Sequence, residues 1–543
     1  MTGTVTDFDL LEHPWIHATT LDGCPRELSL RAVFDDAPTL AALTGELPTQ
    51  SFAILRLLLA VLRRAVQDMP GSTVQVWAKL WSEADRRSAL AAIEAYLDRY
   101  RQRFRLFDTE VPFMQVAGLR SAGDAVSSLD KLIADVPNGE KYFTTRAGAG
   151  VDRIDAAEAA RWLVHAQAFD PSGIKTGAVG DKRVKNNKGY PIGVAWTGGL
   201  GGVFLEGANL WETLLLNLVL SDPDGQRYPS EDLPVWERDP DGPAPRPQGR
   251  PSGPADLCTW QSRRVRLVHN GSHVTGVVLC NGDPLEPFNH HGIEPMTAWR
   301  YSEIQSKKAG HARHYPATHN PERTLWRGLA SLLGEINPTP TSTVVPAVVE
   351  WARYLMDEDE LDPIYPMRLH ATGMQYINNQ SVVGEIIDDT LGFRAAVLAS
   401  DPRLRACALN AVAAAEDAVR AVAGLAADLA RAGGGEPDGA RGRVRERGYF
   451  ALDAPYRRWL AELVPHENGY AAYDLAWQRT VRTVIEPLGN DLVTSAGQAA
   501  WIGREVNGEY LDSGRAEIWF RARLRQILPA AYPHPRTEGG SAA

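Results

Sequence analysis

The histidine-rich segment between residues 290 and 319 is the first place where side chains suggest chemistry. Its members are His290, His291, His311, His314 and His319. The spacing of His311 and His314 is compatible with two ligands of one metal ion, so a metal-dependent hydrolase is one candidate function. No glutamate stands in a His-Glu-x-x-His frame, and no carboxylate partner is evident. Surface histidines in a loop are therefore the favoured interpretation.

Nucleophilic and redox chemistry have little support in this sequence. It contains no Gly-x-Ser-x-Gly nucleophile elbow and no distinctive acid/base pair of carboxylates. The four cysteines lie apart from one another, with no Cys-x-x-Cys pair: Cys24, Cys258, Cys280 and Cys407. This pattern excludes a compact four-thiolate zinc site and argues against a disulfide framework. We expect reduced thiols, no metal, no cofactor and no enzymatic activity.

The segment from Gly173 to Gly189 combines glycines with five basic side chains and a single aspartate. Its core, Gly177-Ala178-Val179-Gly180, lacks the Lys-Ser/Thr of a phosphate-binding loop and follows a predicted helix instead of a strand. Glycines allow a backbone to approach a ligand closely. Phosphates would suit the flanking cations Lys175, Lys182, Arg183, Lys185 and Lys188. On composition alone, a solvated basic loop is the better interpretation.

Four consecutive polar residues, Asn378-Asn379-Gln380-Ser381, precede an apolar-periodic segment that we interpret as the start of a long helical region. Such residues are poor core formers and commonly cap helix N-termini, which is the favoured interpretation from composition. Asn and Gln can also contact base edges in either groove, and a planar amide can wedge beside a base pair. The segment is therefore a second candidate for contact with nucleic acid.

The elements that carry these residues predict an α+β protein of two domains. At 543 residues the chain exceeds the size at which one hydrophobic core stops growing. Residues 1–380 mix strands and helices, which predicts a large α+β domain. Residues 381–543 predict helices only, and their short connections favour an all-α bundle of about four helices.

Hydrophobic periodicity places the main elements of the first domain. We expect a hairpin around Asp22-Gly23, with further strands at 264–268 and 274–279. The expected helices span residues 51–67, 77–103, 155–169 and 210–220.

The charge balance restricts how this chain could bind nucleic acid. Its formal charge is −10, from 57 basic and 67 acidic side chains. Non-specific binding to nucleic acid usually needs a basic protein, so any such role must use local basic patches or other subunits. The N-terminus does not resemble a signal peptide, and no apolar run reaches the roughly 20 residues of a membrane span. We expect a cytoplasmic protein with no membrane partner.

The chain resembles the large subunit (CasA) of Cascade, the type I-E CRISPR surveillance complex, over nearly its whole length. The resemblance rests on the segments Phe8-Asp9-Leu10-Leu11-Glu12-His13-Pro14-Trp15-Ile16, Leu28-Ser29-Leu30-Arg31, Val111-Pro112-Phe113-Met114-Gln115 and Tyr376-Ile377-Asn378-Asn379-Gln380-Ser381. It also rests on the predicted order of an α+β domain followed by a helical bundle.

The resemblance implies a non-catalytic subunit that reads the protospacer-adjacent motif from the minor groove with a glycine loop, a lysine finger and a glutamine wedge. By position, the glycine loop would be Gly177, Ala178, Val179 and Gly180, and the wedge would be Gln380, flanked by Asn379 and Ser381. No lysine is assigned to the finger, and the Cys-x-x-Cys pair of some members is absent. The guide RNA would contact Phe143, Thr144 and Thr145. Contacts with the DNA backbone would involve Lys307, Lys308, Lys182, Arg183 and Lys185.

The implied partners are the 5′ end of the guide RNA (crRNA), double-stranded target DNA, the backbone, small and 5′-handle-binding subunits, and the helicase-nuclease that degrades target. Two other hypotheses remain. A metal-dependent hydrolase would use the histidines of residues 290–319. A purely structural scaffold would dock other subunits without any dependence on a DNA motif.

Overall fold

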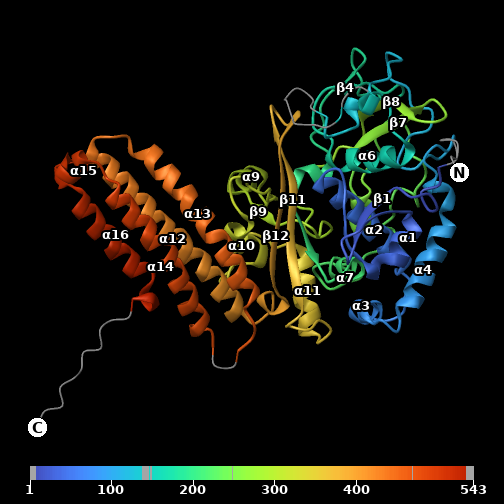
Figure 1. Cartoon of the computed structure of the whole chain (residues 1–543). Helices are drawn as coiled ribbons and strands as arrows, with labels where there is room; N and C mark the ends of the chain where they lie inside the picture. The colour runs from blue at the N-terminus through green and yellow to red at the C-terminus, as the bar shows by residue number, and fades with distance from the viewer. Residues whose placement is uncertain (1–7, 137–145, 147–148, 248, 467–468, 533–543) are drawn as a thin grey trace, which may run out of the picture. The chain divides into compact units, whose positions relative to one another are not determined.

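The computed structural model describes residues 8–136, 146, 149–247, 249–466 and 469–532 (Figure 1). The chain divides into two compact units. The larger unit comprises Met1–Arg323, Asn337–Leu361 and Met367–Thr390. The smaller unit comprises Thr324–Ile336, Asp362–Pro366 and Leu391–Ala543. The larger unit mixes strands with helices and the smaller one is mainly helical, so the predicted α+β fold followed by a helical bundle is confirmed.

A three-stranded antiparallel sheet opens the larger unit. Strand β1 (Ile16–Thr20) pairs with β2 (Pro25–Leu28) across a turn, as the sequence predicts. Gly23 in that turn has φ +85°, a conformation that glycine adopts without steric cost. Strand β3 (Leu40–Leu43) pairs with the other side of β1, so the strand order is β2-β1-β3.

Two helices, α2 (Pro48–Ala65) and α6 (Ala156–Phe169), are buried on most of their faces. Asp155 caps the N-terminus of α6, because its carboxylate accepts a hydrogen bond from Glu158 N at 2.7 Å. The single helix expected over 77–103 is wrong: the chain turns after residue 81, where Ser82 is extended, and forms two helices. The other helices of this unit are α1 (Leu30–Asp36), α3 (Thr73–Trp81), α4 (Arg86–Arg99), α5 (Ala149–Asp152), α7 (Leu210–Leu216), α8 (Pro254–Cys258), α9 (Glu303–Ala309) and α11 (Ala347–Asp357).

A buried ion pair joins α2 to the segment after residue 290. The Arg56 guanidinium donates two hydrogen bonds to Glu294, at 2.7 and 2.8 Å, and both side chains are at most 1% exposed. Trp196 Nε1 donates to the same carboxylate at 2.7 Å. These bonds offset the cost of burying the two charges, although Arg56 Nε has no hydrogen-bond partner within the described chain.

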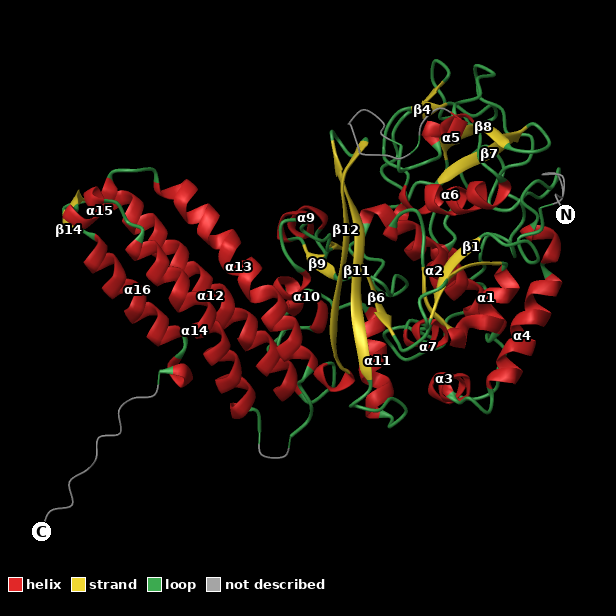
Figure 2. Ribbon diagram, viewed as in Figure 1, coloured by secondary structure: helices red, strands yellow, loops and turns green. Residues whose placement is uncertain are grey.

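A long hairpin runs through the larger unit and ends in the candidate site (Figure 2). Its strands are β11 (Pro366–Ile377) and β12 (Val382–Arg394), and β6 (Gly202–Glu206) pairs with the far side of β11. The helical region expected after Ser381 is therefore wrong for residues 382–394. These residues are rich in β-branched side chains, which suit a strand better than a helix. Residue 380, the predicted end of the first domain, lies in the turn of this hairpin, and the last segment of the larger compact unit ends at Thr390.

A second hairpin supports the candidate site from another side. The predicted strands are confirmed as β7 (Arg263–His269) and β8 (Val274–Asn281), which pair antiparallel. One face of β8 supplies Val278 and Cys280 to a small buried cluster with Val116, Leu119 and Ala178. Shorter strands complete the unit: β4 (Lys175–Thr176), β5 (Lys188–Gly189), β9 (Trp299–Tyr301) and β10 (His314–Pro316).

The smaller unit is built around one alanine-rich helix. Its long helices are α12 (Pro402–Gly433), α13 (Pro437–Ala461), α14 (Ala471–Thr494) and α16 (Ser513–Ile527). Small residues let the helices approach closely: a Cβ at Gly448 would lie 3.1 Å from the Val419 side chain. Tyr456, Trp459 and Trp477 pack together between helices. The remaining elements are α10 (Leu329–Leu333), α15 (Gln498–Ile502), β13 (Arg504–Val506) and β14 (Glu509–Leu511).

Candidate nucleic-acid interface

The turn between β11 and β12, here called the hairpin tip, consists of Asn378, Asn379, Gln380 and Ser381. The first three residues have φ angles of +50°, +56° and +64°, in the left-handed region that non-glycine residues rarely adopt. Their side chains are exposed and, within the described chain, form no hydrogen bonds. The helix-capping interpretation is wrong, because no helix begins here. The turn instead presents three consecutive amide side chains to solvent.

The strained tip is held by bonds to the end of α6 and to the segment that follows it. Ser172 N donates to Gln380 O at 2.8 Å, and the Tyr376 hydroxyl donates to Phe169 O at 2.6 Å. Burial raises the pKa of Tyr376 well above its usual value, so the phenol stays a neutral donor. There is no room for a side chain at Gly198, where a Cβ would lie 2.3 Å from the Tyr376 hydroxyl oxygen. Strained backbone persists where surrounding structure holds it, and these bonds supply that support.

Arg263, the first residue of β7, organises the segment that supports the tip. Its guanidinium is fully buried and donates to the Asp170 carboxylate at 2.5 Å and to the carbonyl oxygens of Asp170, Pro171 and Gly193 at 3.0–3.1 Å. Lys175 Nζ also binds the Asp170 carboxylate, at 2.6 Å. Burial of Asp170 opposes its ionisation, but the two cations outweigh this effect and lower the pKa of the carboxyl. One side chain thus fixes both ends of residues 170–193.

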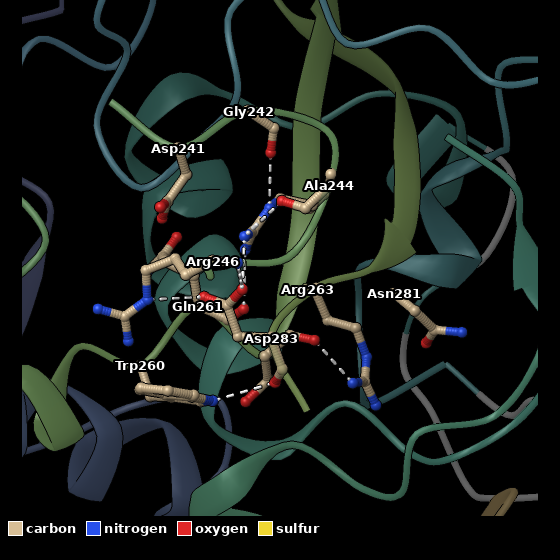
Figure 3. Close-up of polar contacts among 12 residues, drawn as sticks. Asp241, Gly242, Ala244, Arg246, Trp260, Gln261, Arg263, Asn281 and Asp283 are labelled. Carbon is tan, nitrogen blue, oxygen red and sulfur yellow. Dashed lines mark hydrogen bonds and ion pairs between the residues drawn. The ribbon is translucent and has the colours of Figure 1, made fainter. Parts of the chain in front are cut away.

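Arg264, the next residue, points to the opposite face of β7, because successive strand residues alternate in direction. There it fixes a different loop. It donates to Gly242 O at 2.8 Å, to Ala244 O at 3.1 Å and to the Asp283 carboxylate at 2.7 Å. Arg246 binds Asp283 as well, and its guanidinium lies 4.2 Å from the ring centroid of Trp260 (Figure 3). Arg263 extends away from Gly242 and Ala244, on the other side (Figure 3). The two arginines therefore anchor two different loops.

The glycine loop, Gly177 to Gly180, belongs to the first of these anchored segments, residues 170–193. Ala178 is buried in the cluster with Val278 and Cys280, whereas Val179 is 45% exposed. A Cβ at Gly177 would lie 2.5 Å from Val184 Cγ1, and one at Gly180 would lie 3.0 Å from Pro243 Cγ. Gly180 also has φ +98°. Packing within the protein therefore accounts for both glycines, and only residues 179 and 180 offer backbone to solvent.

The basic residues of this loop differ in how they are used. Arg183 binds the Asp181 carboxylate and donates to Gly282 O at 3.0 Å, so it fixes the loop to the end of β8. Lys175 is mostly buried against Asp170, and this burial lowers its pKa. Lys182, Lys185 and Lys188 are exposed. The solvated cations of the loop are therefore these three lysines.

Lys307 and Lys308 lie in the last turn of α9, where cations interact favourably with the helix dipole. Lys307 pairs with Glu303 one turn earlier, at 2.6 Å, and both side chains are more than two-thirds exposed. An exposed pair of this kind contributes little to stability. Both lysines remain accessible to an anionic partner.

Two histidines of residues 290–319 lie within hydrogen-bonding distance of backbone carbonyl groups. His319 Nε2 lies 2.9 Å from Gly202 O, and His290 Nε2 lies 2.8 Å from Glu286 O. Burial lowers the pKa of His290, His291, His314 and His319, which favours their neutral forms. Among the residues that the structure describes, no group of three or more His, Cys, Asp or Glu side chains is placed to hold a metal ion. The hydrolase hypothesis therefore has no ligand set in the described part of the chain.

Two further predictions concern the guide-RNA contacts and membrane-spanning helices, not the interface described above. Phe143, Thr144 and Thr145, the expected guide-RNA contacts, lie outside the described residues. None of the described helices combines the length and apolar character that crossing a bilayer demands.

Sequence reasoning missed the residues that position the candidate interface. Asp170, Arg263 and Arg264 carry no motif. Tyr376 stood only in a segment that carries the family resemblance, with no role assigned to it. One signal was available: two adjacent arginines open a strand of alternating pattern, so one of them had to face each side of the sheet.

Comparisons with known proteins add to this geometry. A family model described as CRISPR-associated protein Cse1 matches residues 9–487. The chain belongs to the Cse1 family. The resemblance to the CasA large-subunit family is thereby confirmed, since the CasA/Cse1 protein of Thermus thermophilus is 28% identical over 513 residues, covering 92% of this chain and 91% of that protein.

Solved structures of the family share this fold. The crystal structure of Thermobifida fusca Cse1 is 44% identical with a TM-score of 0.89, and the match covers 98% of this chain and 100% of that one. Cse1 from Acidimicrobium ferrooxidans is 29% identical with a TM-score of 0.80, covering 96% and 98%. A chain of a CRISPR RNA-guided surveillance complex matches with a TM-score of 0.64 at 20% identity, covering 90% and 99%, which indicates a common fold.

Proposed function

We propose that this Cse1-family chain is the large, non-catalytic subunit of an RNA-guided DNA surveillance complex, and that it reads the protospacer-adjacent motif of duplex DNA and starts strand separation. The observation that carries the proposal is the hairpin tip. Gln380 is exposed on a strained turn whose backbone is bonded to the rest of the larger unit. Polar side chains held in this way, with no hydrogen bond inside the described chain, suit contact with a partner.

The tip would act at the first step of duplex opening. Separating stacked base pairs costs about 1.4 kcal/mol per step, and pairing with the guide RNA offsets that cost only after the first steps. A planar amide that takes the place of a stacked neighbour would lower the initial cost. Gln380 would be this wedge, with Asn379 and Ser381 beside it at the minor groove.

The glycine loop would contribute backbone contacts to the same groove. Gly177 and Ala178 shape the loop, while Val179 and Gly180 offer backbone close to a ligand. The minor groove distinguishes base pairs only partly, so readout there should tolerate several motifs. Phosphate contacts would come from Lys182, Lys185, Lys307 and Lys308, with Arg183 holding the loop in place. Residues 189–306 contain no lysine, so a lysine finger would have to come from elsewhere.

The remaining partners follow from membership of such a complex. The 5′ end of the guide RNA would contact Phe143, Thr144 and Thr145, and the backbone, small and 5′-handle-binding subunits would surround this chain. A helicase-nuclease would dock on the assembled complex. With a formal charge of −10, the chain itself would leave most neutralisation of DNA phosphates to those subunits.

The test replaces Gln380 with alanine in the assembled complex. We expect R-loop formation on a linear, motif-bearing duplex to slow by about tenfold, which corresponds to about one lost stacking step. Gln375→Ala is the matched control, because Gln375 is an exposed glutamine on the same hairpin. The fluorescence of 2-aminopurine placed beside the motif would report base unstacking.

Complex assembly should be unchanged in both variants, as measured by size-exclusion chromatography with guide RNA. Equal R-loop rates for Gln380→Ala and the original complex would contradict the wedge. Binding that ignores the motif altogether would favour the scaffold hypothesis.

A further inference from the structure

Two large apolar side chains are exposed in the segment that Arg263 anchors, close to the hairpin tip. Ile174 is 58% exposed and Tyr190 is 52% exposed. Neither takes part in the contacts proposed above for reading the motif. A single exposed apolar residue needs no explanation, whereas a contiguous apolar surface beside polar residues is typical of a binding site.

The short strands β4 and β5 place these two side chains on one surface. The strands pair antiparallel, with Lys175 opposite Gly189. One position further, the same register sets Ile174 opposite Tyr190, and side chains opposite each other project from the same face. Successive side chains alternate in direction, and Lys175 accordingly turns inward to Asp170 while Ile174 faces solvent. Ile174 and Tyr190, here called the platform, therefore form one exposed apolar surface.

The platform is fixed to the protein on both of its strands. Tyr190 O accepts a hydrogen bond from the buried side chain of Asn281 at 2.7 Å. Ser172, two residues before Ile174, donates its N–H to Gln380 O at 2.8 Å. Among the described residues, the Tyr190 hydroxyl has no hydrogen-bond partner. The platform thus lies beside the hairpin tip, with an aromatic ring that is free to bind a ligand.

Positive charge lies next to the platform and is not balanced within the segment. Residues 170–193 contain two acidic side chains, and both have partners inside the protein. Asp170 binds Lys175 and Arg263, and Asp181 binds Arg183. Three exposed lysines of the segment form no ion pair with any described residue: Lys182, Lys185 and Lys188. The surface around the platform is therefore complementary to an anion.

We propose that the platform stacks against the first unpaired base of the displaced DNA strand, at the fork that the hairpin tip opens. An aromatic ring can stack on any base, and neighbouring lysines can bind the phosphates, as is usual for single-stranded nucleic acid. A base inside a duplex already has neighbours on both faces, so a free ring suits an unpaired base. The target strand regains a stacked duplex by pairing with the guide RNA, whereas the displaced strand has no such partner. The inference rests on the proposed strand-opening function and adds a residue that holds the strand once it is open.

Photocrosslinking tests which base contacts the platform. The assembled complex with guide RNA is bound to motif-bearing duplexes whose first positions beside the motif are mismatched and therefore already open. One duplex carries 5-iodouracil at the first unpaired position of the displaced strand, and another carries it in the target strand. Irradiation joins this base to an aromatic side chain stacked on it, and mass spectrometry locates the joined residue. We expect a crosslink to Tyr190 from the displaced strand. A crosslink to Tyr190 from the target strand only, or from neither strand, would overturn the proposal.

Affinity for the pre-opened duplex separates the platform from the wedge. The duplex ends after the mismatched positions, so that pairing with the guide does not dominate, and fluorescence anisotropy gives the Kd. Tyr190→Ala should weaken binding about tenfold through loss of one stacked base, whereas Tyr190→Phe keeps the ring and should bind normally. Tyr354→Ala, which removes an exposed tyrosine of α11, is the matched control. Gln380→Ala should also bind normally, because no base pair has to be opened.

Thermal unfolding verifies that each variant is folded. Unchanged affinity of Tyr190→Ala, or an equal loss in Tyr354→Ala, would overturn the platform, and slow opening of a closed duplex by Gln380→Ala would still support the wedge. Weak binding by Tyr190→Ala together with normal opening by Gln380→Ala would support the platform as a site for unpaired DNA and contradict the wedge alone.

Discussion

The hairpin tip and the glycine loop are both proposed to contact DNA, yet they are built in opposite ways. The tip exposes its side chains and bonds its backbone to neighbouring segments, through Ser172 and Tyr376. The glycine loop buries Ala178 and needs its glycines for internal packing against Val184 and Pro243. The first region presents side chains from a strained backbone, and the second presents backbone from a packed loop.

Because of this difference, the effects of substitutions on folding can be separated from their effects on DNA binding. The Gln380 side chain forms no hydrogen bond within the described chain, so its replacement should alter function without loss of stability. Gly177 is constrained by its neighbours, so its replacement should alter stability first. Impaired DNA binding after a glycine substitution would therefore be ambiguous, whereas the same result at Gln380 would be direct.

The largest effect is expected for Arg263→Met, which disrupts the support of the tip. Removing one partner of a buried charge pair costs about 3–5 kcal/mol of unfolding free energy. Chemical denaturation measures this loss. Hydrogen exchange should accelerate in residues 170–193, whose carbonyl groups Arg263 binds. Arg264→Met is the matched control, and it should loosen residues 242–246 instead. Identical exchange maps for the two variants would show that the arginines do not anchor separate loops.

A smaller effect is expected for Gly177→Val, which overpacks the glycine loop. A Cβ at this position would lie 2.5 Å from Val184 Cγ1, and forced repacking costs about 1–3 kcal/mol. Thermal or chemical unfolding measures the change, and binding to motif-bearing duplex should fall with it. Gly123→Val is the control, because a Cβ there would meet nothing within 4 Å. Unchanged stability of Gly177→Val would indicate that the loop adapts freely.

Substitutions at positive-φ positions should change the stability of the chain in opposite directions in the two regions. Gln380→Gly relieves a left-handed backbone at a non-glycine residue and should stabilise the chain by about 1 kcal/mol. Gly180→Ala introduces that strain at φ +98° and should destabilise it by about the same amount. Unfolding midpoints measure both changes. Destabilisation by Gln380→Gly would mean that the side chain contributes to folding after all.

The smallest effect on folding is expected for the exposed lysines. Lys182→Ala and Lys185→Ala should each change stability by less than about 0.5 kcal/mol, as usual at surface positions. If both lysines bind phosphates, the slope of log affinity against log salt concentration should fall by about 0.9 for each. Lys188→Ala tests whether the third exposed lysine contributes equally. A salt dependence that none of these variants changes would remove the loop from the DNA interface.

Much of the fold followed from local sequence patterns. The hairpin around Gly23, the helix capped by Asp155 and the strands β7 and β8 have side-chain periods and turn residues that determine their structure locally. Residues 382–394 were wrongly predicted to be helical, because over a short stretch their apolar residues fit either the helical or the strand period. Pairing with β11 decided in favour of a strand, and sequence periodicity alone does not include that partner.

The sequence by itself determined which residues could face a partner: the amide cluster at 378–381, the glycines at 177 and 180, and the basic residues around them. Only the tertiary structure decided how these residues are held. A hydrogen bond joins Asp170 to Arg263, 93 residues apart, and another joins Tyr376 to Phe169, 207 residues apart. Such bonds depend on the spatial arrangement of distant segments, which local propensity and spacing do not encode.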